Sequence, residues 1–130
     1  MPNVGTVLLV EDEPTIRELL KRFLERANFN VLQAADGVEG LVTARAQRPD
    51  VIILDNVMPR MTGVEMFQAL RASAETCCIP VLFATAFAKR CEEVVKGDAN
   101  ARVFQKPFLL SELITALHSA IRPNDKDCTG

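Results

Sequence analysis

Short apolar runs alternate with amphipathic segments along most of the chain. Five runs have the length of single strands, and most are rich in branched or aromatic residues. They cover residues 6–10, 30–34, 51–54, 80–85 and 102–105. Because most of these runs are apolar throughout, we expect strands that are buried on both faces of a sheet.

Helical spacing fills the segments between these runs. Apolar residues at i, i+3, i+4 and i+7 predict helices at residues 14–27, 64–70 and 110–121. Asp36 and Thr62 are each followed three positions later by a glutamate, a pattern typical of helix starts. Residues 36–47 and about 88–96 complete a set of five helices.

Strands that alternate with helices predict one α/β domain of three layers. Right-handed crossovers place helices on both faces of a parallel sheet, so the expected architecture is (βα)5. A length of 130 residues suits one domain of common size and leaves no room for a second. We place the domain at residues 1–122 and expect a polar tail at residues 123–130.

Charge and composition limit the partners and the location. The 15 Lys and Arg against 17 Asp and Glu give a net charge of −2, which offers no basic field for direct nucleic acid binding. No run has the length of a membrane span or the form of a signal peptide. The four cysteines have neither zinc-site spacing nor the pattern of a secreted disulfide framework. We therefore expect free thiols in a soluble, cytoplasmic protein.

Functional groups of a doubly wound parallel sheet belong at the carboxyl ends of its strands. The residues at these ends are Glu11 and Asp12 after the first strand, Asp55 after the third, Thr85 at the fourth and Lys106 after the fifth. Three carboxylates, a hydroxyl and an ammonium thus converge on one edge. We expect a functional site there.

The charges at this edge indicate its chemistry. Three carboxylates held close together repel one another unless a cation joins them, and oxygen ligands without His or Cys suit Mg²⁺. Magnesium usually combines one or two carboxylates with a phosphate oxygen, so the site predicts a phosphoryl group. Asp55 at the centre can attack phosphorus to form an acyl phosphate. Mg²⁺ and Lys106 would neutralise the phosphoryl oxygens, and the Thr85 hydroxyl would donate to one of them.

Four motifs together resemble a known family. They are Glu11-Asp12, Asp55 with Met58-Pro59, Thr85-Ala86, and Lys106-Pro107-Phe108. In this order they resemble the receiver domain of bacterial two-component response regulators, and the likeness covers about residues 5–121. The resemblance implies a flavodoxin-like, five-stranded parallel sheet with strand order 2-1-3-4-5.

The same resemblance implies a role for each site residue. Asp55 would be the phosphoacceptor, Thr85 the switch hydroxyl and Lys106 the phosphate-binding lysine. The implied ligands of Mg²⁺ are Glu11, Asp12, Asp55 and the backbone carbonyl of Val57. Such a domain catalyses only its own phosphorylation and dephosphorylation.

The resemblance also implies partners. A sensor histidine kinase or a phosphotransfer protein would supply the phosphoryl group. Phosphorylation would change the surface of the fourth helix, the fifth strand and the fifth helix, which a downstream output protein or domain would detect.

One position departs from the family pattern. Receivers commonly carry an aromatic residue three positions before the lysine, and here that position is Val103. Phe104 should lie on the opposite face of the strand because side chains alternate. We therefore do not expect this chain to couple Thr85 to the protein surface through the rotamer of an aromatic side chain.

Two other classes of function stay open. A phosphohydrolase of the dehalogenase type also uses an aspartate and Mg²⁺, but its DxD signature requires Asp at position 57, where Val57 stands. A receiver-shaped interaction module that works without phosphate is favoured by Val103 and opposed by the complete set of acids, threonine and lysine. Labelling by a small phosphodonor separates these classes.

Overall fold

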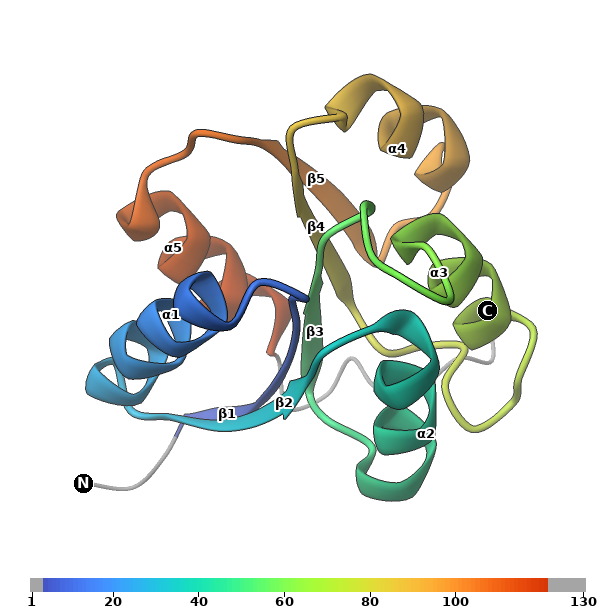
Figure 1. Cartoon of the computed structure of the whole chain (residues 1–130). Coiled ribbons are helices and arrows are strands. Elements are labelled where there is room, and N and C mark those ends of the chain that lie inside the picture. Colours follow the sequence, from blue (N-terminus) through green and yellow to red (C-terminus); the bar gives the residue numbers. More distant parts are fainter. Residues whose placement is uncertain (1–3, 122–130) are drawn as a thin grey trace.

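The computed structural model describes residues 4–121 as one parallel sheet between two layers of helices (Figure 1). The strands are β1 (Gly5–Val10), β2 (Phe29–Ala34), β3 (Val51–Leu54), β4 (Val81–Thr85) and β5 (Ala101–Gln105). The helices are α1 (Pro14–Arg26), α2 (Gly37–Gln47), α3 (Gly63–Arg71), α4 (Ala88–Val95) and α5 (Leu110–Ala120). Helices α1 and α5 cover one face of the sheet, and α2, α3 and α4 cover the other (Figure 1).

The sheet has the order β2-β1-β3-β4-β5, and every pairing is parallel. The predicted flavodoxin-like order and the five expected strands and helices are therefore confirmed. The expected polar tail at residues 123–130 lies outside the described residues, so the domain boundary stays a prediction.

Four strands start one residue away from the expected position, and β4 is the one that starts later than expected. Pro80 precedes β4 rather than opening it. Because proline has no backbone N–H, it cannot donate to a neighbouring strand. Its carbonyl still accepts a hydrogen bond from the Ile52 N–H at 2.9 Å, which starts the pairing with β3.

Side-chain caps start the two helices that the sequence marked. The Asp36 carboxylate accepts from the Glu39 N–H at 2.9 Å at the start of α2. Thr62 and Glu65 form a reciprocal capping box at the start of α3, with distances of 3.1 and 2.9 Å. These contacts satisfy N–H groups that have no partner within the helix, which explains why the helices begin there.

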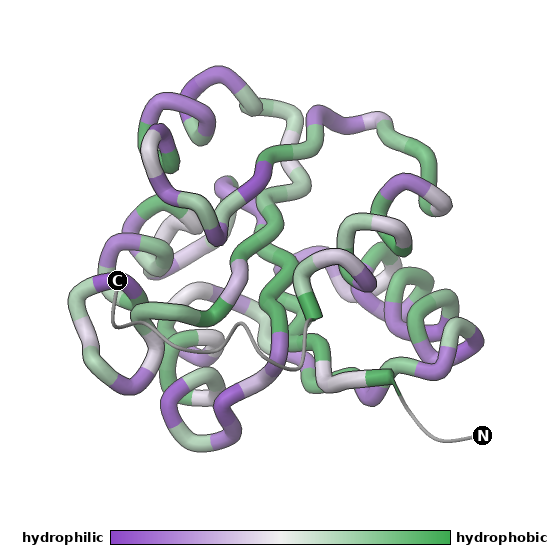
Figure 2. The backbone as a smooth tube through the Cα atoms, turned by 180° about the vertical axis from the view of Figure 1, so that it is seen from behind, coloured by the Kyte–Doolittle hydropathy of each residue, from purple (hydrophilic) through white to green (hydrophobic). Residues whose placement is uncertain are grey.

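The sheet divides the core into two hydrophobic clusters, one under α2, α3 and α4 and the other under α1 and α5. Figure 2 shows the most hydrophobic stretches along the central strands. Val103 packs against the first cluster and Phe104 against the second. The predicted placement of these neighbours on opposite faces of β5 is therefore confirmed.

The cysteine prediction holds only in part. Cys77 and Cys91 are free, and burial raises the pKa of the Cys91 thiol to about 11. The expectation is wrong for Cys78, which is disulfide-bonded. Among residues 4–121, no helix is long and apolar enough to cross a membrane.

Arg71, at the end of α3, joins the helix to the segments before β4 and β5. Its guanidinium donates to Asp98 Oδ2 at 2.7 Å, to the Ile79 carbonyl at 2.8 Å and to the Asn100 carbonyl at 3.2 Å. It also stacks on the Phe67 ring, 4.8 Å from its centroid. Burial alone would raise the pKa of Asp98, but hydrogen bonds from Arg71 and the Asn100 N–H lower it below its ordinary value of 3.8.

Arg71→Ala should reduce the free energy of unfolding at pH 7 by about 1–3 kcal/mol, because partly buried acceptors lose a charged donor. The pKa of Asp98 is lower in the folded state than in the unfolded chain. The pair therefore stabilises the fold above pH 3.8, and this contribution is lost as the pH falls through the folded-state pKa. Urea unfolding at several pH values measures the free energy of unfolding of both proteins. The difference between Arg71→Ala and wild type should become smaller at acid pH.

Arg22→Ala is a matched control, because Arg22 pairs with Glu18 at 3.1 Å with 75% of its side chain exposed. An exposed pair of this kind contributes at most about 1 kcal/mol. If Arg71→Ala and Arg22→Ala lowered the free energy of unfolding by the same amount, the role of Arg71 would be contradicted.

Candidate functional site

The carboxyl ends of β1, β3 and β5 bring three charged side chains into contact. The Lys106 ammonium lies 3.1 Å from Asp55 Oδ2 and 3.4 Å from Glu11 Oε1. Each of these residues directly follows its strand, so the parallel pairing carries all three to one edge of the sheet. One cation therefore bridges two carboxylates.

Glu11 is buried and held by the backbone around it. Its N–H donates to the Ala34 carbonyl at 3.1 Å, which extends the pairing of β1 with β2. Its Oε2 accepts from the Glu13 N–H at 3.2 Å, and its carbonyl accepts from the Arg17 guanidinium at 2.7 Å. Only 4% of Glu11 is exposed, so its carboxylate has a fixed position under the site.

The two oxygens of Asp55 have different partners. Oδ1 accepts from the N–H groups of Asn56 at 2.7 Å and Val57 at 3.4 Å, whereas Oδ2 faces Lys106. The buried Asn56 side chain in turn accepts from the Val64 N–H at 3.0 Å, in the first turn of α3. The loop between β3 and α3 thus folds back on Asp55 and orients its carboxylate.

Gly63 lets α3 begin directly against this aspartate. A Cβ at position 63 would overlap the Asp55 carbonyl oxygen and approach Asn56 Cα to 2.8 Å. The Gly63 N–H also donates to the Asn56 carbonyl at 3.0 Å. The close approach needs a residue without a side chain.

Thr85 lies beside the charged cluster, and its hydroxyl is bound within its own loop. The residue is fully buried, and its Oγ1 accepts from the Phe87 N–H at 3.0 Å. Its carbonyl accepts from the Lys106 N–H at 2.8 Å. The backbone therefore places Thr85 next to Lys106, while the hydroxyl proton has no role in fixing the carboxylates.

Two of the predicted metal ligands are exposed. Asp12 follows the buried Glu11 and faces solvent, and Val57 is 56% exposed. Within the described part of the chain, no group of three or more His, Cys, Asp and Glu side chains is arranged as around a metal ion. The ligand set of Glu11, Asp12, Asp55 and the Val57 carbonyl thus stays a prediction.

The pKa values of Glu11 and Lys106 are both raised, and in each residue burial and the neighbouring opposite charge act in opposite directions. Burial raises the pKa of Glu11, and the attraction of Lys106 offsets this only in part. Burial would lower the pKa of Lys106, but attraction to Asp55 and Glu11 outweighs it and raises the pKa. Lys106 is therefore firmly charged, and Glu11 would gain from a further nearby cation.

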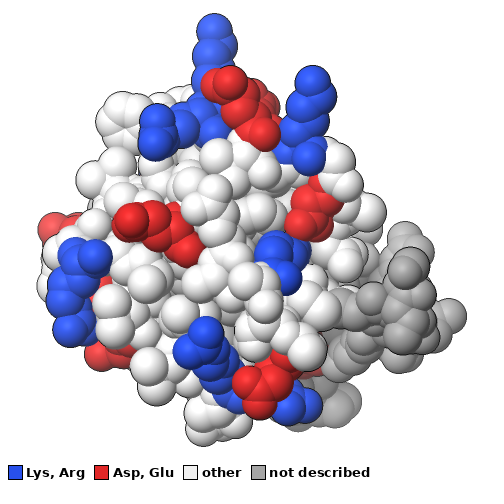
Figure 3. Space-filling view, turned by 90° about the vertical axis from the view of Figure 1, so that its right-hand side faces the viewer, with Lys and Arg blue, Asp and Glu red and all other residues white. Residues whose placement is uncertain are grey.

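The surroundings of the site are apolar at two points. Val57 and Phe87 are each 56% exposed, and each lies two positions after a predicted site residue. The face formed by α2, α3 and α4 carries both signs of charge, with Lys and Arg lying next to Asp and Glu at several places (Figure 3). This face therefore has no basic field.

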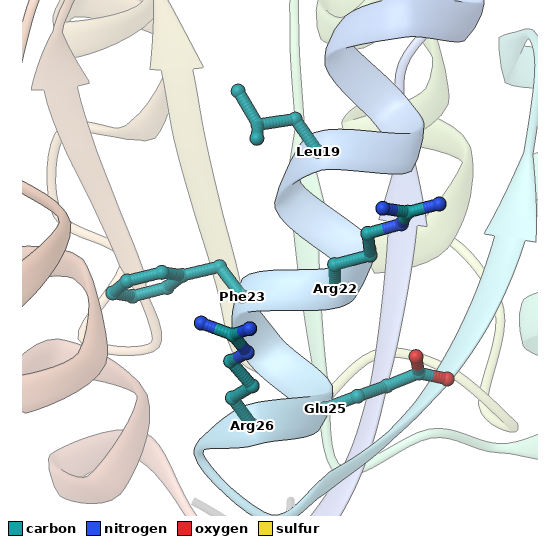
Figure 4. Close-up of a pocket in the computed structure, with 5 residues that line it drawn as sticks. All are labelled: Leu19, Arg22, Phe23, Glu25 and Arg26. Atoms are coloured by element: carbon teal, nitrogen blue, oxygen red, sulfur yellow. The ribbon is translucent and has the colours of Figure 1, made fainter.

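A hollow of about 530 Å³ lies along α1 and contains none of the predicted site residues. It is lined by Leu19, Arg22, Phe23, Glu25 and Arg26 (Figure 4). Figure 4 shows all five side chains projecting from the same helix. The charged cluster is thus built at the sheet edge and not in this hollow.

Sequence reasoning missed two residues that shape the site. Arg17 holds the Glu11 carbonyl, and the Asn56 side chain holds the start of α3. Neither had a signal in the hydrophobic pattern, because both are polar residues whose partners are fixed by the fold.

Residues 7–118 match the family described as the response regulator receiver domain. The chain is 33% identical over 121 residues to the DNA-binding dual master transcriptional regulator RpaA of Synechocystis, covering 92% of this chain and 50% of that protein. It is 37% identical over 117 residues to the response regulator MprA of Mycobacterium avium, covering 89% and 50%. The chain therefore belongs to the response regulator receiver domain family. It spans about half the length of these curated relatives.

Solved structures agree with this assignment. The Vibrio cholerae chemotaxis protein CheY4 matches with a TM-score of 0.80 and 33% identity, over 89% of this chain and 98% of that one. The receiver domain of the Pseudomonas aeruginosa sensor histidine kinase PA1611, described with a magnesium ion coordinated in its active site cleft, matches with a TM-score of 0.80 and 28% identity. That match covers 90% of this chain and 97% of the other. A phosphoacceptor switch in two-component signalling is the function consistent with these relatives.

Gly63→Ala should lower the free energy of unfolding by about 1–3 kcal/mol, because the new methyl group must displace the backbone at Asp55. Thermal unfolding measures this loss. Gly40→Ala is the control, because the three atoms nearest to its Cβ would all be side-chain atoms, two at the flexible end of Met66 and one of Val10, at 3.0 Å. A Gly63→Ala variant as stable as Gly40→Ala would contradict the tight approach.

Proposed function

We propose that Asp55 accepts a phosphoryl group from a sensor histidine kinase or a phosphotransfer protein. The observation that carries this proposal is the position of its carboxylate, with Oδ1 held by two backbone N–H groups and Oδ2 beside Lys106. A carboxylate oxygen would attack phosphorus, forming the O–P bond of an acyl phosphate as the bond from phosphorus to the donor histidine nitrogen breaks. The released imidazole would take up a proton.

The residues at the site fit Mg²⁺ as a cofactor. Glu11, Asp12, Asp55 and the Val57 carbonyl offer oxygen atoms only, the ligands that Mg²⁺ prefers. When bound, Mg²⁺ would supply positive charge to the phosphoryl oxygens. The burial of Glu11 fits this assignment, because a nearby divalent cation would offset the cost of an ionised carboxylate away from water.

Lys106 and Thr85 would hold the transferred group. The Lys106 ammonium remains charged because its pKa is raised, and it would pair with a phosphoryl oxygen as it now pairs with Asp55. The Thr85 oxygen accepts from the Phe87 N–H, so the hydroxyl proton is available for donation to another phosphoryl oxygen. The chain would catalyse only its own phosphorylation and dephosphorylation.

The change would reach the surface of α4, β5 and α5 through the loop after β4. Drawing Thr85 toward Asp55 would move the segment that starts α4, because Phe87 is bonded to the Thr85 hydroxyl. Val103 has no aromatic ring that could change its rotamer when Thr85 moves. The change would therefore reach the surface mainly through displacement of the backbone after β4. A downstream output protein or domain would bind this surface in the cytoplasm, without direct nucleic acid binding by this chain.

Asp55→Asn should take no label from acetyl phosphate and Mg²⁺, whereas wild type gains one phosphoryl group by intact mass. The wild-type label should be lost in hydroxylamine, because an acyl phosphate is a mixed anhydride. Asp98→Asn, which changes an aspartate outside the site, should label like wild type.

Each contrary result has its own meaning. Labelling of Asp55→Asn would refute the assignment of the acceptor. A wild-type chain that takes no label would favour the interaction module that works without phosphate, and steady hydrolysis of phosphomonoesters would favour the phosphohydrolase.

Asp12→Asn should weaken Mg²⁺ binding and labelling together, by about tenfold, because the variant removes part of the negative field that holds the cation. Glu13→Gln is the matched control, because it changes an adjacent exposed acid whose side-chain oxygen caps α1 at 3.3 Å. Mg²⁺ titration followed by amide chemical shifts measures the affinity. Equal affinities for Asp12→Asn and wild type would make Asp12 structural only.

A further inference from the structure

An ion pair joins the loop between β3 and α3 to the start of α2. Arg60 donates to Asp36 Oδ2 from Nε at 3.0 Å and from Nη2 at 2.8 Å. The other oxygen of Asp36 caps α2 by accepting from the Glu39 N–H at 2.9 Å. The cap fixes the carboxylate, which has only 12% of its side chain exposed, so the guanidinium meets a rigid partner.

The backbone at Arg60 needs such a partner. Its φ of +67° lies in the left-handed region, which side chains other than Asn and Asp rarely adopt. The next N–H, that of Met61, donates back to the Pro59 carbonyl at 2.7 Å and closes a tight turn. The ion pair therefore holds a turn that the sequence alone does not favour.

A second contact with α2 lies one residue further along. Gly37, in the first turn of α2, packs so closely on the Met61 backbone that an added Cβ would overlap the Met61 carbonyl oxygen. The middle of the loop is thus fixed to α2 by charge at Arg60 and by packing at Met61.

These contacts restrict the backbone next to the phosphoacceptor. Only Met58 and Pro59 separate Val57 from the anchored Arg60, and the Val57 N–H already donates to Asp55 Oδ1. We propose that Arg60 is a positioning residue, which acts through Asp36 to hold the Val57 backbone beside Asp55. This inference rests on the proposed function, because the position of Val57 matters to metal binding and phosphoryl transfer at Asp55.

Geometry separates this role from general stabilisation. The Arg60 side chain is 59% exposed, and exposed ion pairs contribute little to overall stability. Removing the Arg60–Asp36 ion pair should therefore loosen the loop between β3 and α3 and weaken metal binding at the site. The free energy of global unfolding should change little. Lysine would not replace it, because a guanidinium directs two N–H groups at one oxygen.

Arg60→Asn and Asp36→Asn test the pair. Asparagine tolerates the left-handed backbone at position 60, and at position 36 it keeps an oxygen that caps α2. Arg48→Asn is the matched control. Arg48 also has a positive φ, of 45°, with 64% of its side chain exposed and an ion pair to Glu75 at 3.6 Å.

Two measurements on the intact chain should change together. Without Mg²⁺, hydrogen exchange at the Val57 and Met61 amides should be severalfold faster in Arg60→Asn and in Asp36→Asn than in wild type. The variant that carries both substitutions should exchange at the same rate as either single variant, because both substitutions break the same ion pair. The Mg²⁺ concentration for half-maximal labelling by acetyl phosphate should rise about tenfold in both. Arg48→Asn should match wild type in both measurements.

Unchanged exchange in Arg60→Asn would overturn the inference, even where wild type labels at Asp55. Faster exchange with an unchanged Mg²⁺ requirement would also overturn it, because the pair would then be structural only. An Arg48→Asn variant that changes as much as Arg60→Asn would do the same. A wild-type chain that takes no label would refute the proposed function itself, and the positioning role with it.

Discussion

The Lys106 ammonium lies between two carboxylates that would otherwise repel one another at the edge of an apolar sheet. Glu11 is buried and Asp55 is half-buried, so neither charge is well solvated. Lys106 allows both to remain at the ends of adjacent strands, and they in turn raise its pKa. The site therefore depends on a cation that is supplied by an edge strand of the sheet.

The two loops that flank Asp55 and Thr85 differ in how firmly they are held. The loop after β3 is tied by the Asn56 side chain, by the close packing of Gly63 and by Arg60. The loop after β4 is held by two side-chain hydrogen bonds, from the Phe87 N–H to Thr85 Oγ1 at 3.0 Å and from Gln105 Nε2 to the Ala86 carbonyl at 3.1 Å, and α4 begins without a side-chain cap. In the proposed function, the loop that holds Asp55 would stay fixed while the loop after Thr85 moves.

Apolar runs predicted the five strands, of which the central strands β1, β3 and β4 are the most buried. Amphipathic spacing predicted α1, α3 and α5, whereas it did not mark α2 and α4. Charges at the strand ends predicted the site, whereas the strand order came from resemblance to a family. The ion pairs of Arg60 and Arg71 had no sequence signal, because their partners lie 24 and 27 residues away and only the folded chain brings them together. The reversed backbone at Arg60 was likewise hidden, since glycine or asparagine usually marks such a turn.

The chain is made in an order that leaves the site incomplete until late. Asp55 precedes Lys106 by 51 residues, and Glu11 precedes it by 95. Because Lys106 follows β5, and β5 pairs only with β4, the ammonium reaches the two carboxylates only when β5 has docked on the edge of the sheet. A ribosome-bound chain that has emerged only through β4 carries the aspartate without its counter-ion. In the proposed function, Asp55 would have its lysine partner for phosphoryl transfer only after β5 has docked.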